Sequence, residues 1–347
     1  MSYHEEEKKD LTIRLRKLLR ELPDFCYEYF RGIEPTTAER TRLGYAHDLR
    51  IFFQFLLEEE RSLEGKSMNE IQISDLAAVT PTKLEMFLDY VTYYDRDGEE
   101  LQNGEKGKAR KLAAVRSMFK YFYRKQLIPS NPASLVSTPK IHDKNIIKLD
   151  VDEIARLLDQ VESGDKLTQK QQVYHKANKA RDLAIVTLLL GTGIRVSECV
   201  GLDIQDVDFN HNRVKVVRKG GNEAVVYFGD EVRQALLVYI DERKEILAMD
   251  GHENALFLSM QKRRLTVRSV ENLVKKYSQS VIALKHISPH KLRSSYGTAL
   301  YNETGDIYLV ADVLGHKDVN TTRKHYAQLE DARRREAAKF VHLRKED

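Results

Sequence analysis

Three of the seven prolines fall within one polar stretch, and this feature most restricts how the chain can fold. Pro129, Pro132 and Pro139 lie between two regions with helical periodicity. Proline lacks a backbone donor and favours extended backbone, so the helical pattern breaks here. At 347 residues the chain is also long for one domain and sufficient for two. We therefore predict two domains, 1–138 and 150–347, joined by a linker over 139–149.

The sequence before the linker predicts a small bundle of helices. Between residues 36 and 60, apolar side chains such as Leu49 and Phe53 recur every three or four positions, which is typical of one buried helical face. Thr80 followed by Pro81 is typical of a helix start, with threonine as the N-cap and proline in the first helical position. Another helix is therefore expected to begin at Pro81.

A basic stretch follows in the same domain. From 106 to 125 the chain has eight Lys or Arg and no Asp or Glu, although the net charge of the whole chain is only +4. Leu112, Val115 and Phe119 form one helical face, so the cations are expected to point outward from the other face. Such a stripe is typical of a surface that meets a phosphate backbone, although a solvated helix face has the same composition. The expected DNA contacts are Lys106, Lys108, Arg110, Lys111 and Arg116.

The sequence after the linker predicts a mixed, mostly helical domain. Asp150 with Glu153 three residues later is typical of a capping box. A buried helix over 181–190 is expected to end at the Gly191-Thr192-Gly193 turn. Two strands are predicted over 214–217 and 224–228, around a turn at 219–222, which gives a small antiparallel sheet. Further helices are predicted over 231–247, 267–280, 289–302, 307–314, 321–327 and 331–343. The expected fold class is mainly α.

Several functional classes lack their sequence signals. Cys26 and Cys199 form no disulfide framework and no metal-ligand pattern, which fits a reducing cytosol. The acidic start has no signal-peptide pattern, and the longest apolar run, 183–190, is too short to span a membrane. His286 and His290 have the spacing of a zinc pair, but Ser288-Pro289 breaks the shared helical face. We therefore expect a cytoplasmic protein with no membrane span and no cofactor.

Two motifs suggest a site for an anion. Ser288-Pro289 is typical of a helix start, so His290 and Arg293 share one face of the first turn, where free N–H groups and the helix dipole favour a phosphate. Arg195 follows a glycine turn that lacks the third glycine of a nucleotide fingerprint. Two arginine forks, Arg195 and Arg293, could hold both non-bridging oxygens of a phosphate. Taken singly, each motif also fits an ordinary helix end with exposed charges.

Lys219 and Tyr326 would complete a phosphoryl-transfer site. An ammonium group at the predicted turn could give its proton to a leaving oxygen, and Lys215 and Arg218 are rivals of Lys219 for this role. Tyr326 is one of 17 tyrosines, and a phenol with a pKa of ~10 is a poor nucleophile at neutral pH. Nearby cations and a base must therefore stabilise its ionised form.

Five motifs, taken together and in order, resemble the tyrosine recombinase family, also called phage-integrase-like recombinases. They are Gly191-Thr192-Gly193-Ile194-Arg195-Val196-Ser197-Glu198, Arg218-Lys219-Gly220-Gly221, Pro289-His290-Lys291-Leu292-Arg293, Leu314-Gly315-His316 and Thr321-Thr322-Arg323-Lys324-His325-Tyr326. The resemblance implies an amino-terminal SAM-like core-binding domain and a carboxy-terminal catalytic domain that clamp double-stranded DNA. It also implies a catalytic set consisting of Arg195, Lys219, His290, Arg293, His316 and Tyr326.

The resemblance further implies a reaction and an assembly. Tyr326 would attack the scissile phosphate to leave a 3′-phosphotyrosyl bond and a free 5′-hydroxyl, so that religation needs neither ATP nor metal. Strand exchange would pass through a Holliday junction in a homotetramer, with the last helix, which contains Leu329, Phe340 and Val341, docked on a neighbouring subunit. Glu198 matches an acidic position that orients the pocket.

Within the family the chain is most similar to the Xer branch, in particular the XerS type. The long amino-terminal leader and a polar insertion over 163–179 support this subtype, whereas Ser294 stands where many relatives have histidine. Chromosome dimer resolution is the expected role. Integration of a phage or conjugative element, relaxation of DNA by a monomeric type IB topoisomerase and a non-catalytic DNA-binding regulator stay open as alternatives.

Overall fold

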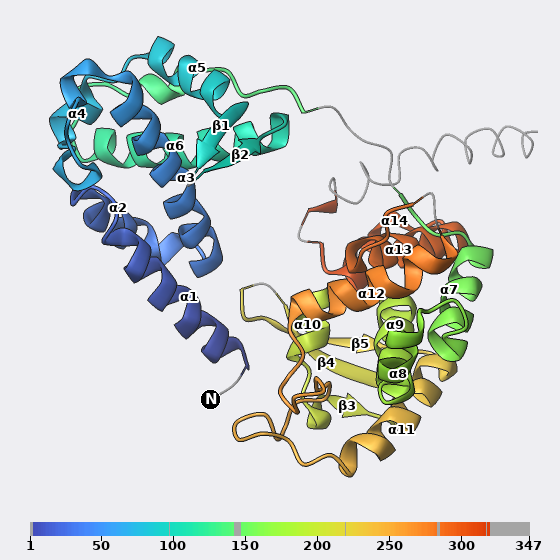
Figure 1. Ribbon diagram of the computed structural model, residues 1–347. Coiled ribbons are helices and arrows are strands. Elements are labelled where there is room, and N and C mark those ends of the chain that lie inside the picture. The colour runs from blue at the N-terminus through green and yellow to red at the C-terminus, as the bar shows by residue number, and fades with distance from the viewer. Residues whose placement is uncertain are drawn as a thin grey trace, which may run out of the picture. The chain divides into compact units, whose positions relative to one another are not determined.

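The computed structural model describes residues 3–96, 98–141, 147–218, 220–282, 285–316 and 318–319. The chain divides into two compact units, Met1–Lys144 and Asn145–Asp347, and the boundary lies within the stretch where the sequence predicts a linker. Both units are mainly helical, and each holds a small antiparallel sheet (Figure 1). The expected fold class is confirmed.

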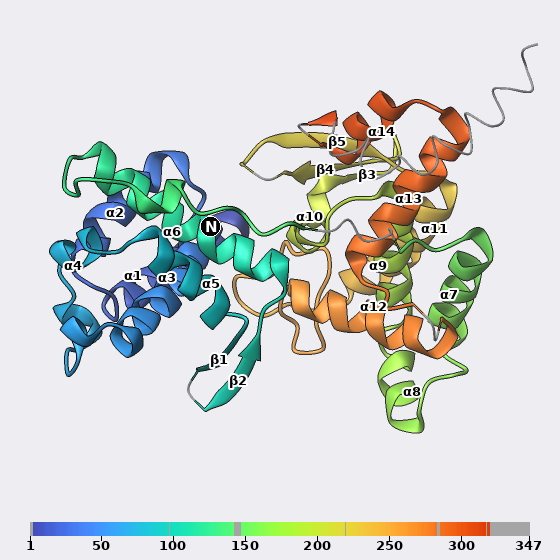
Figure 2. The same cartoon turned by 90° about the horizontal axis from the view of Figure 1, so that it is seen from above.

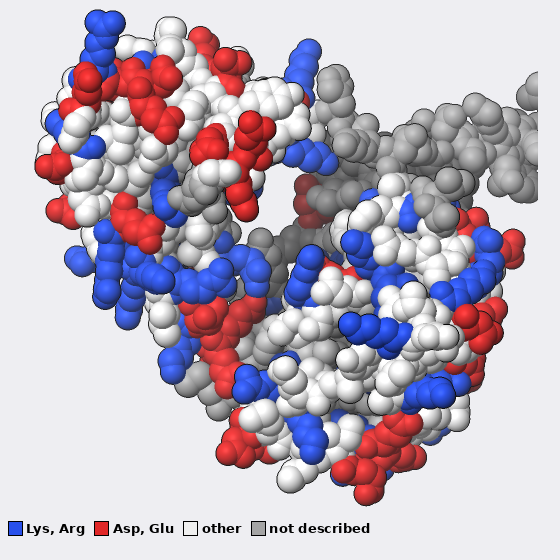
Figure 3. Space-filling view, in the orientation of Figure 1, with Lys and Arg blue, Asp and Glu red and all other residues white. Residues whose placement is uncertain are grey.

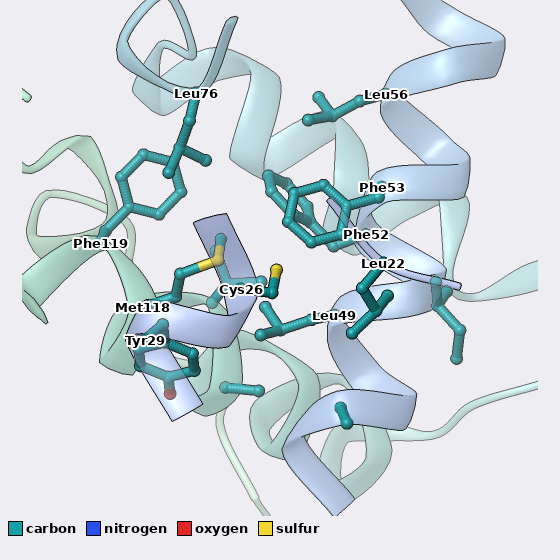
Figure 4. Packing of buried hydrophobic residues seen from close by; sticks show 14 of the residues in the cluster. Leu22, Cys26, Tyr29, Leu49, Phe52, Phe53, Leu56, Leu76, Met118 and Phe119 are labelled. Carbon is teal, nitrogen blue, oxygen red and sulfur yellow. The ribbon is translucent and has the colours of Figure 1, made fainter. Parts of the chain in front are cut away.

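The first unit is a helical bundle with one β-hairpin. Its core gathers aromatic and aliphatic side chains from all six helices α1–α6, and Figure 4 shows Phe52 and Phe53 packed beside Leu22 and Leu49. The Phe52 and Phe87 rings meet edge-on with centroids 5.2 Å apart. The elements are α1 (Tyr3–Leu19), α2 (Phe25–Ile33), α3 (Glu39–Glu59), α4 (Ile73–Ala77), α5 (Pro81–Tyr90), β1 (Tyr93–Arg96), β2 (Glu99–Gln102) and α6 (Glu105–Arg124), with 3-10 turns at Glu34–Thr36, Arg61–Leu63, Met68–Glu70 and Pro132–Ser134.

The second unit contains the larger sheet and the remaining helices. The sheet has the order β3-β4-β5, and β4 pairs antiparallel with β5 so that Val214 lies opposite Val226. The elements are α7 (Val151–Ser163), α8 (Gln169–Lys176), α9 (Lys179–Thr192), α10 (Val196–Gly201), a 3-10 turn (Ile204–Asp206), β3 (Val207–Asp208), β4 (Arg213–Val217), β5 (Glu223–Tyr227), α11 (Asp230–Lys244), α12 (Val267–Val281), α13 (Pro289–Thr304) and α14 (Ile307–Leu314).

Helix α9 is the centre of the second unit. Its apolar residues are buried on nearly every side, and it packs against α7, α11 and α13 (Figures 1 and 2). The helix ends at Thr192, two residues later than the sequence predicts, because Gly193 adopts the left-handed conformation that closes a helix. This turn sets the point from which the chain continues to Arg195.

Helix starts follow their local capping signals. Thr80 Oγ accepts a hydrogen bond from Lys83 N (3.2 Å), and α5 begins at Pro81 as predicted. Asp150 and Glu153 exchange hydrogen bonds of 2.8 and 2.9 Å, which confirms the predicted capping box of α7. The predicted helices over 321–327 and 331–343 lie outside the described residues.

The polar insertion over 163–179 forms helix α8, which the sequence analysis did not predict. His175 on this helix is buried, and its Nδ1 lies 3.0 Å from the hydroxyl of Tyr277, which donates to Asp182 (2.8 Å). Burial lowers the pKa of His175 and raises the pKa of Tyr277. The insertion is therefore anchored to α9 and α12 through a buried polar chain.

The structure also describes Cys199 and the apolar helices. Cys199 is fully buried, and burial raises the pKa of its thiol to about 12, as expected of a small core residue. Among the described residues, no helix is both long and apolar enough to cross a membrane.

Candidate active site

The carboxy-terminal end of α14 is the point where the site assembles. Gly315 follows the helix with a φ of 63°, and the backbone N–H groups of Gly315 and His316 turn back to Asp312 O (2.8 Å) and Ala311 O (2.9 Å). The last carbonyl groups of a helix have no partner within it, so the oxygens of this turn remain available to other donors. Three arginines from elsewhere in the unit use them.

Arg195 reaches this turn from the start of α10. Its Nη2 donates to Gly315 O (3.2 Å), and its Nη1 donates to the carboxylate of Glu198 (2.7 Å). Glu198 is buried and also accepts from the backbone N–H of Arg195 (2.9 Å), so its carboxylate binds both the backbone and the guanidinium of Arg195. The carboxylate of Glu198 thus holds the guanidinium of Arg195 in place.

Arg293 reaches the same turn from α13. Its side chain is buried, with Nη1 donating to Gly193 O and Nη2 donating to Leu314 O. These bonds join α13 to the end of α9 and the end of α14. The structure therefore brings Arg195 and Arg293 together, as the sequence predicts, because they donate to the consecutive carbonyl groups of Gly315 and Leu314.

Arg218 is the third arginine at this helix end. It follows β4, and its Nη2 donates to Val313 O (3.0 Å) while its Nη1 lies 3.4 Å from Asp312 O. The sequence analysis considered Arg218 only as a rival proton donor and missed this role as a helix cap. Three positive charges at a helix carboxyl end are favourable because the helix dipole is negative there.

The two histidines lie on the segments that these arginines connect. His316 directly follows Gly315 and is half-buried, whereas His290 is exposed in the first turn of α13, three residues before Arg293. Ser288 occupies the N-cap position, but its side chain makes no capping hydrogen bond, contrary to the usual role of a serine there. The interaction between Lys291 N and Ser288 O (2.8 Å) is a backbone one.

Two expected site residues, Lys219 and Tyr326, lie outside the described residues. Of the rivals of Lys219, Lys215 is 3.4 Å from the carboxylate of Glu223, and Arg218 is bound to α14. Both rivals are therefore engaged elsewhere. Within the described ranges, no group of three or more His, Cys, Asp or Glu residues is placed to hold a metal ion.

The basic stretch on α6 corrects part of the expected DNA surface. Lys111 is buried and donates to Asn103 (2.8 Å), and Arg116 donates to Ala133 O (3.0 Å) and Val136 O, so neither points outward. Arg110 pairs with the buried Asp48, and Lys108 lies 3.1 Å from Glu105. Lys111, Arg116 and Arg110 therefore bind groups outside α6, whereas the run of charges predicts that they face solvent.

Other cations of the first unit remain exposed. Lys106, Lys120 and Arg124 are exposed on α6, and their separations of 14 and 4 residues are near whole helical turns, so they share a face. Figure 3 also shows Lys and Arg gathered along α1, which has Arg16 and Lys17 in its last turn. Exposed positive charge in this unit is therefore carried by both helices.

Comparison with known protein families decides the membership of the chain. The model of the phage integrase family matches residues 148–333, which is more than half of the 347 residues. The chain belongs to the phage integrase family. As a member of this family of tyrosine recombinases, it is a site-specific recombinase.

Curated relatives of this recombinase are similar over most of its length. A tyrosine recombinase XerC of Caldanaerobacter subterraneus is 31% identical over 318 residues, which cover 89% of this chain and 83% of the relative. A tyrosine recombinase XerD of Staphylococcus haemolyticus is 32% identical over 299 residues, which cover 86% of this chain and 90% of the relative.

Solved structures share the fold of the recombinase at lower identity. The XerH site-specific recombinase bound to a palindromic difH substrate matches with a TM-score of 0.63 and 21% identity, over 87% of this chain and 80% of that one. The Tn1549 transposon integrase in complex with circular intermediate DNA matches with a TM-score of 0.60 and 21% identity, over 88% of this chain and 95% of that one.

Proposed function

We propose that this recombinase cuts and rejoins double-stranded DNA at specific sites through a 3′-phosphotyrosyl bond to Tyr326. The observation that carries the proposal is the meeting of Arg195 and Arg293 at the turn that leads to His316. Two planar forks at one place suit the two non-bridging oxygens of a phosphodiester. The XerH and Tn1549 structures, both described as complexes with their DNA, support DNA as the partner.

The reaction requires no external energy source in this proposal. The phenol oxygen of Tyr326 forms a bond to phosphorus as its proton passes to a pocket histidine, and the bond from phosphorus to the 5′ oxygen breaks. Lys219 gives its proton to that 5′ oxygen, while the arginines, His290 and His316 stabilise the charge on the phosphoryl group. The free 5′-hydroxyl of a partner strand reverses the step, so neither ATP nor a metal ion enters.

The assembly and the biological role are proposed on the same basis. Strand exchange in a homotetramer passes through a Holliday junction, with the last helix docked on a neighbouring subunit. The Xer names of the relatives favour chromosome dimer resolution in the cytoplasm. The proposed assignment to the XerS subtype is based on the long amino-terminal segment and the polar insertion over 163–179. Integration of a mobile element is the alternative, and mapping the DNA bound in cells separates the two: one chromosomal locus supports resolution, and element ends support integration.

A nicked suicide substrate built on the mapped site tests the chemistry. Cleavage of such a duplex releases a short strand that cannot religate, so the protein stays covalently bound to DNA. Tyr326→Phe should abolish covalent capture while site binding remains, because only the phenol oxygen is lost. Capture by this variant would contradict the nucleophile assignment, and capture by neither protein would favour a non-catalytic regulator. Strand exchange between two sites distinguishes the recombinase from a monomeric topoisomerase.

A further inference from the structure

Arg218 connects two segments that are far apart in the sequence. It directly follows β4, and its guanidinium lies at the carboxyl end of α14, where it donates to Val313 O, 95 residues away along the chain (3.0 Å). The next residue after Arg218 is Lys219, and the second residue after α14 is His316. The side chain of Arg218 therefore links the β4–β5 turn to the segment that carries a pocket histidine.

The backbone of Arg218 is held as firmly as its side chain. Its N–H donates to Asn222 O (2.8 Å), and its carbonyl accepts from Gly221 N (3.0 Å). Gly220 and Gly221 have φ values of 97° and 82°, which only glycine adopts without strain, so they close the turn tightly. The chain thus enters the β4–β5 turn from a fixed point.

The contact with α14 also depends on a glycine. Gly315 has a φ of 63°, and a Cβ atom at this position would overlap the guanidinium of Arg218. Arg218 therefore lies directly against the Gly315 backbone. Glycine is needed here both for the left-handed helix end and for the approach of the arginine.

Stability alone gives little reason for this arrangement. A cation at an exposed helix end stabilises by about 0.3–1 kcal/mol. The buried Nε of Arg218 has no hydrogen-bond partner among the described residues, and an unpaired buried donor carries a cost. The contact is therefore weak as a source of stability but specific in geometry.

We propose that Arg218 is a positioning residue that holds the β4–β5 turn against the end of α14 and thereby supports proton donation to the 5′ oxygen. This inference depends on the proposed role of Lys219 as the donor of the proton to the 5′ oxygen. Without Arg218 the two segments separate, and the proton donor is misplaced while the arginines still bind the phosphate. A misplacement of about 1 Å is enough to slow a reaction by roughly 100-fold.

A substrate that needs no proton donor tests this role. Replacing the scissile 5′ oxygen by sulfur gives a thiolate leaving group, and since a thiol has a pKa of only ~8.5, it leaves without a proton. Single-turnover cleavage of the oxygen and sulfur substrates would be measured for the wild type, Lys219→Ala, Arg218→Ala and Arg218→Lys. Arg213→Ala, at the other end of β4, is the matched control, because Arg213 pairs only with Asp208 on the sheet surface in the described structure.

Arg218→Ala should cleave the oxygen substrate about 10 to 100 times more slowly and the sulfur substrate within about threefold of the wild type. Lys219→Ala should show the same pattern, Arg218→Lys should recover part of the rate, and Arg213→Ala should match the wild type on both substrates. An equal loss by Arg218→Ala on both substrates, or no loss on either, would overturn the positioning role. If the sulfur substrate does not restore cleavage by Lys219→Ala, Lys219 is not the proton donor. The proposal for Arg218 would then also be wrong, because it depends on that role. Arg218→Lys keeps the charge, and its rates decide the matter if the alanine variant unfolds.

Discussion

Arg195 and Arg293 donate hydrogen bonds to adjacent carbonyl groups, Gly315 O and Leu314 O, at the end of one helix. Two guanidinium groups repel each other, and the oxygens of this turn, together with Glu198, offset that repulsion. The protein thus holds two arginine forks close together before any anion arrives. Preorganisation of this kind is how charged groups stabilise a transition state.

Replacement of either arginine by lysine should separate catalysis from folding. Lysine keeps the charge but loses the fork, so Arg195→Lys and Arg293→Lys should each reduce the rate of covalent DNA capture by roughly 100-fold or more. Arg293→Lys should also lower the free energy of unfolding by about 1–3 kcal/mol, because Arg293 is buried and Gly193 O or Leu314 O loses its donor. Single-turnover capture and thermal unfolding measure the two effects. Capture at the wild-type rate by both variants would exclude the pair from the reaction.

Gly193→Ala should disturb the end of α9. The φ of 63° disfavours any side chain, and a Cβ atom would overlap Tyr296 and contact Leu314, so we expect a loss of about 1–2 kcal/mol in the free energy of unfolding. Gly229→Ala is the control, since its φ is negative and a Cβ atom there meets nothing within 4 Å. Equal midpoints of thermal unfolding for the two variants would show that the Gly193 turn has no special requirement.

Local signals predicted much of the fold and part of the site. The starts of α5 and α7 follow from Thr80-Pro81 and from Asp150 with Glu153, because capping depends on residues only three positions apart. The β1–β2 hairpin was missed because its strands lack apolar alternation, although Asp97-Gly98 is a hairpin signal. The helix capping by Arg218 joins residues about 95 positions apart, and no local pattern indicates such a contact.

The positions of the α6 cations also could not be predicted from local sequence. The charge run gave no sign that Lys111 would be buried 5.8 Å from the centroid of the Tyr94 ring, because Tyr94 approaches through tertiary packing. Periodicity nonetheless identified the apolar face correctly, since Leu112, Val115 and Phe119 are fully buried. Sequence thus predicts which face of a helix is apolar better than which cations stay in solvent.

The salt dependence of DNA binding should depend on the exposed cations of α6. Each phosphate contact contributes about 0.9 to the slope of log K against log salt, so Lys106→Gln with Lys120→Gln should reduce the slope by roughly 1 to 2. Fluorescence anisotropy with duplex DNA over a range of salt concentrations measures it. Lys166→Gln with Lys170→Gln removes the same charge from exposed positions of the second unit. If the two pairs change the slope equally, the α6 face is not a specific contact.

Asp48 should make the stability of the first unit depend on pH. Burial raises the pKa of its carboxyl group to about 6, and the ion pair with Arg110 only partly opposes this. A raised carboxyl pKa favours the protonated folded state, so this contribution is present below pH ~4 and is lost as the pH rises through about 6, by roughly 3 kcal/mol in all.

Asp48→Asn should remove that dependence. The variant should gain thermal stability relative to the wild type as the pH rises from 4.5 to 7.5, because asparagine has no charge to desolvate. Asp89→Asn, at an exposed position of α5, should keep a constant difference from the wild type over the same range. A constant difference for Asp48→Asn as well would show that the carboxyl group is not perturbed by burial.

The identity of the DNA-linked residue tests the central proposal most directly. Trypsin cleavage of the trapped complex after Lys324 and Arg333 releases His325–Arg333, a peptide with one tyrosine, and mass spectrometry after nuclease digestion locates the attached nucleotide. We expect a nucleotide joined through its 3′-phosphate to Tyr326, with a free 5′-hydroxyl on the released strand. A link to another residue, or a 5′-phosphate link, would contradict the mechanism.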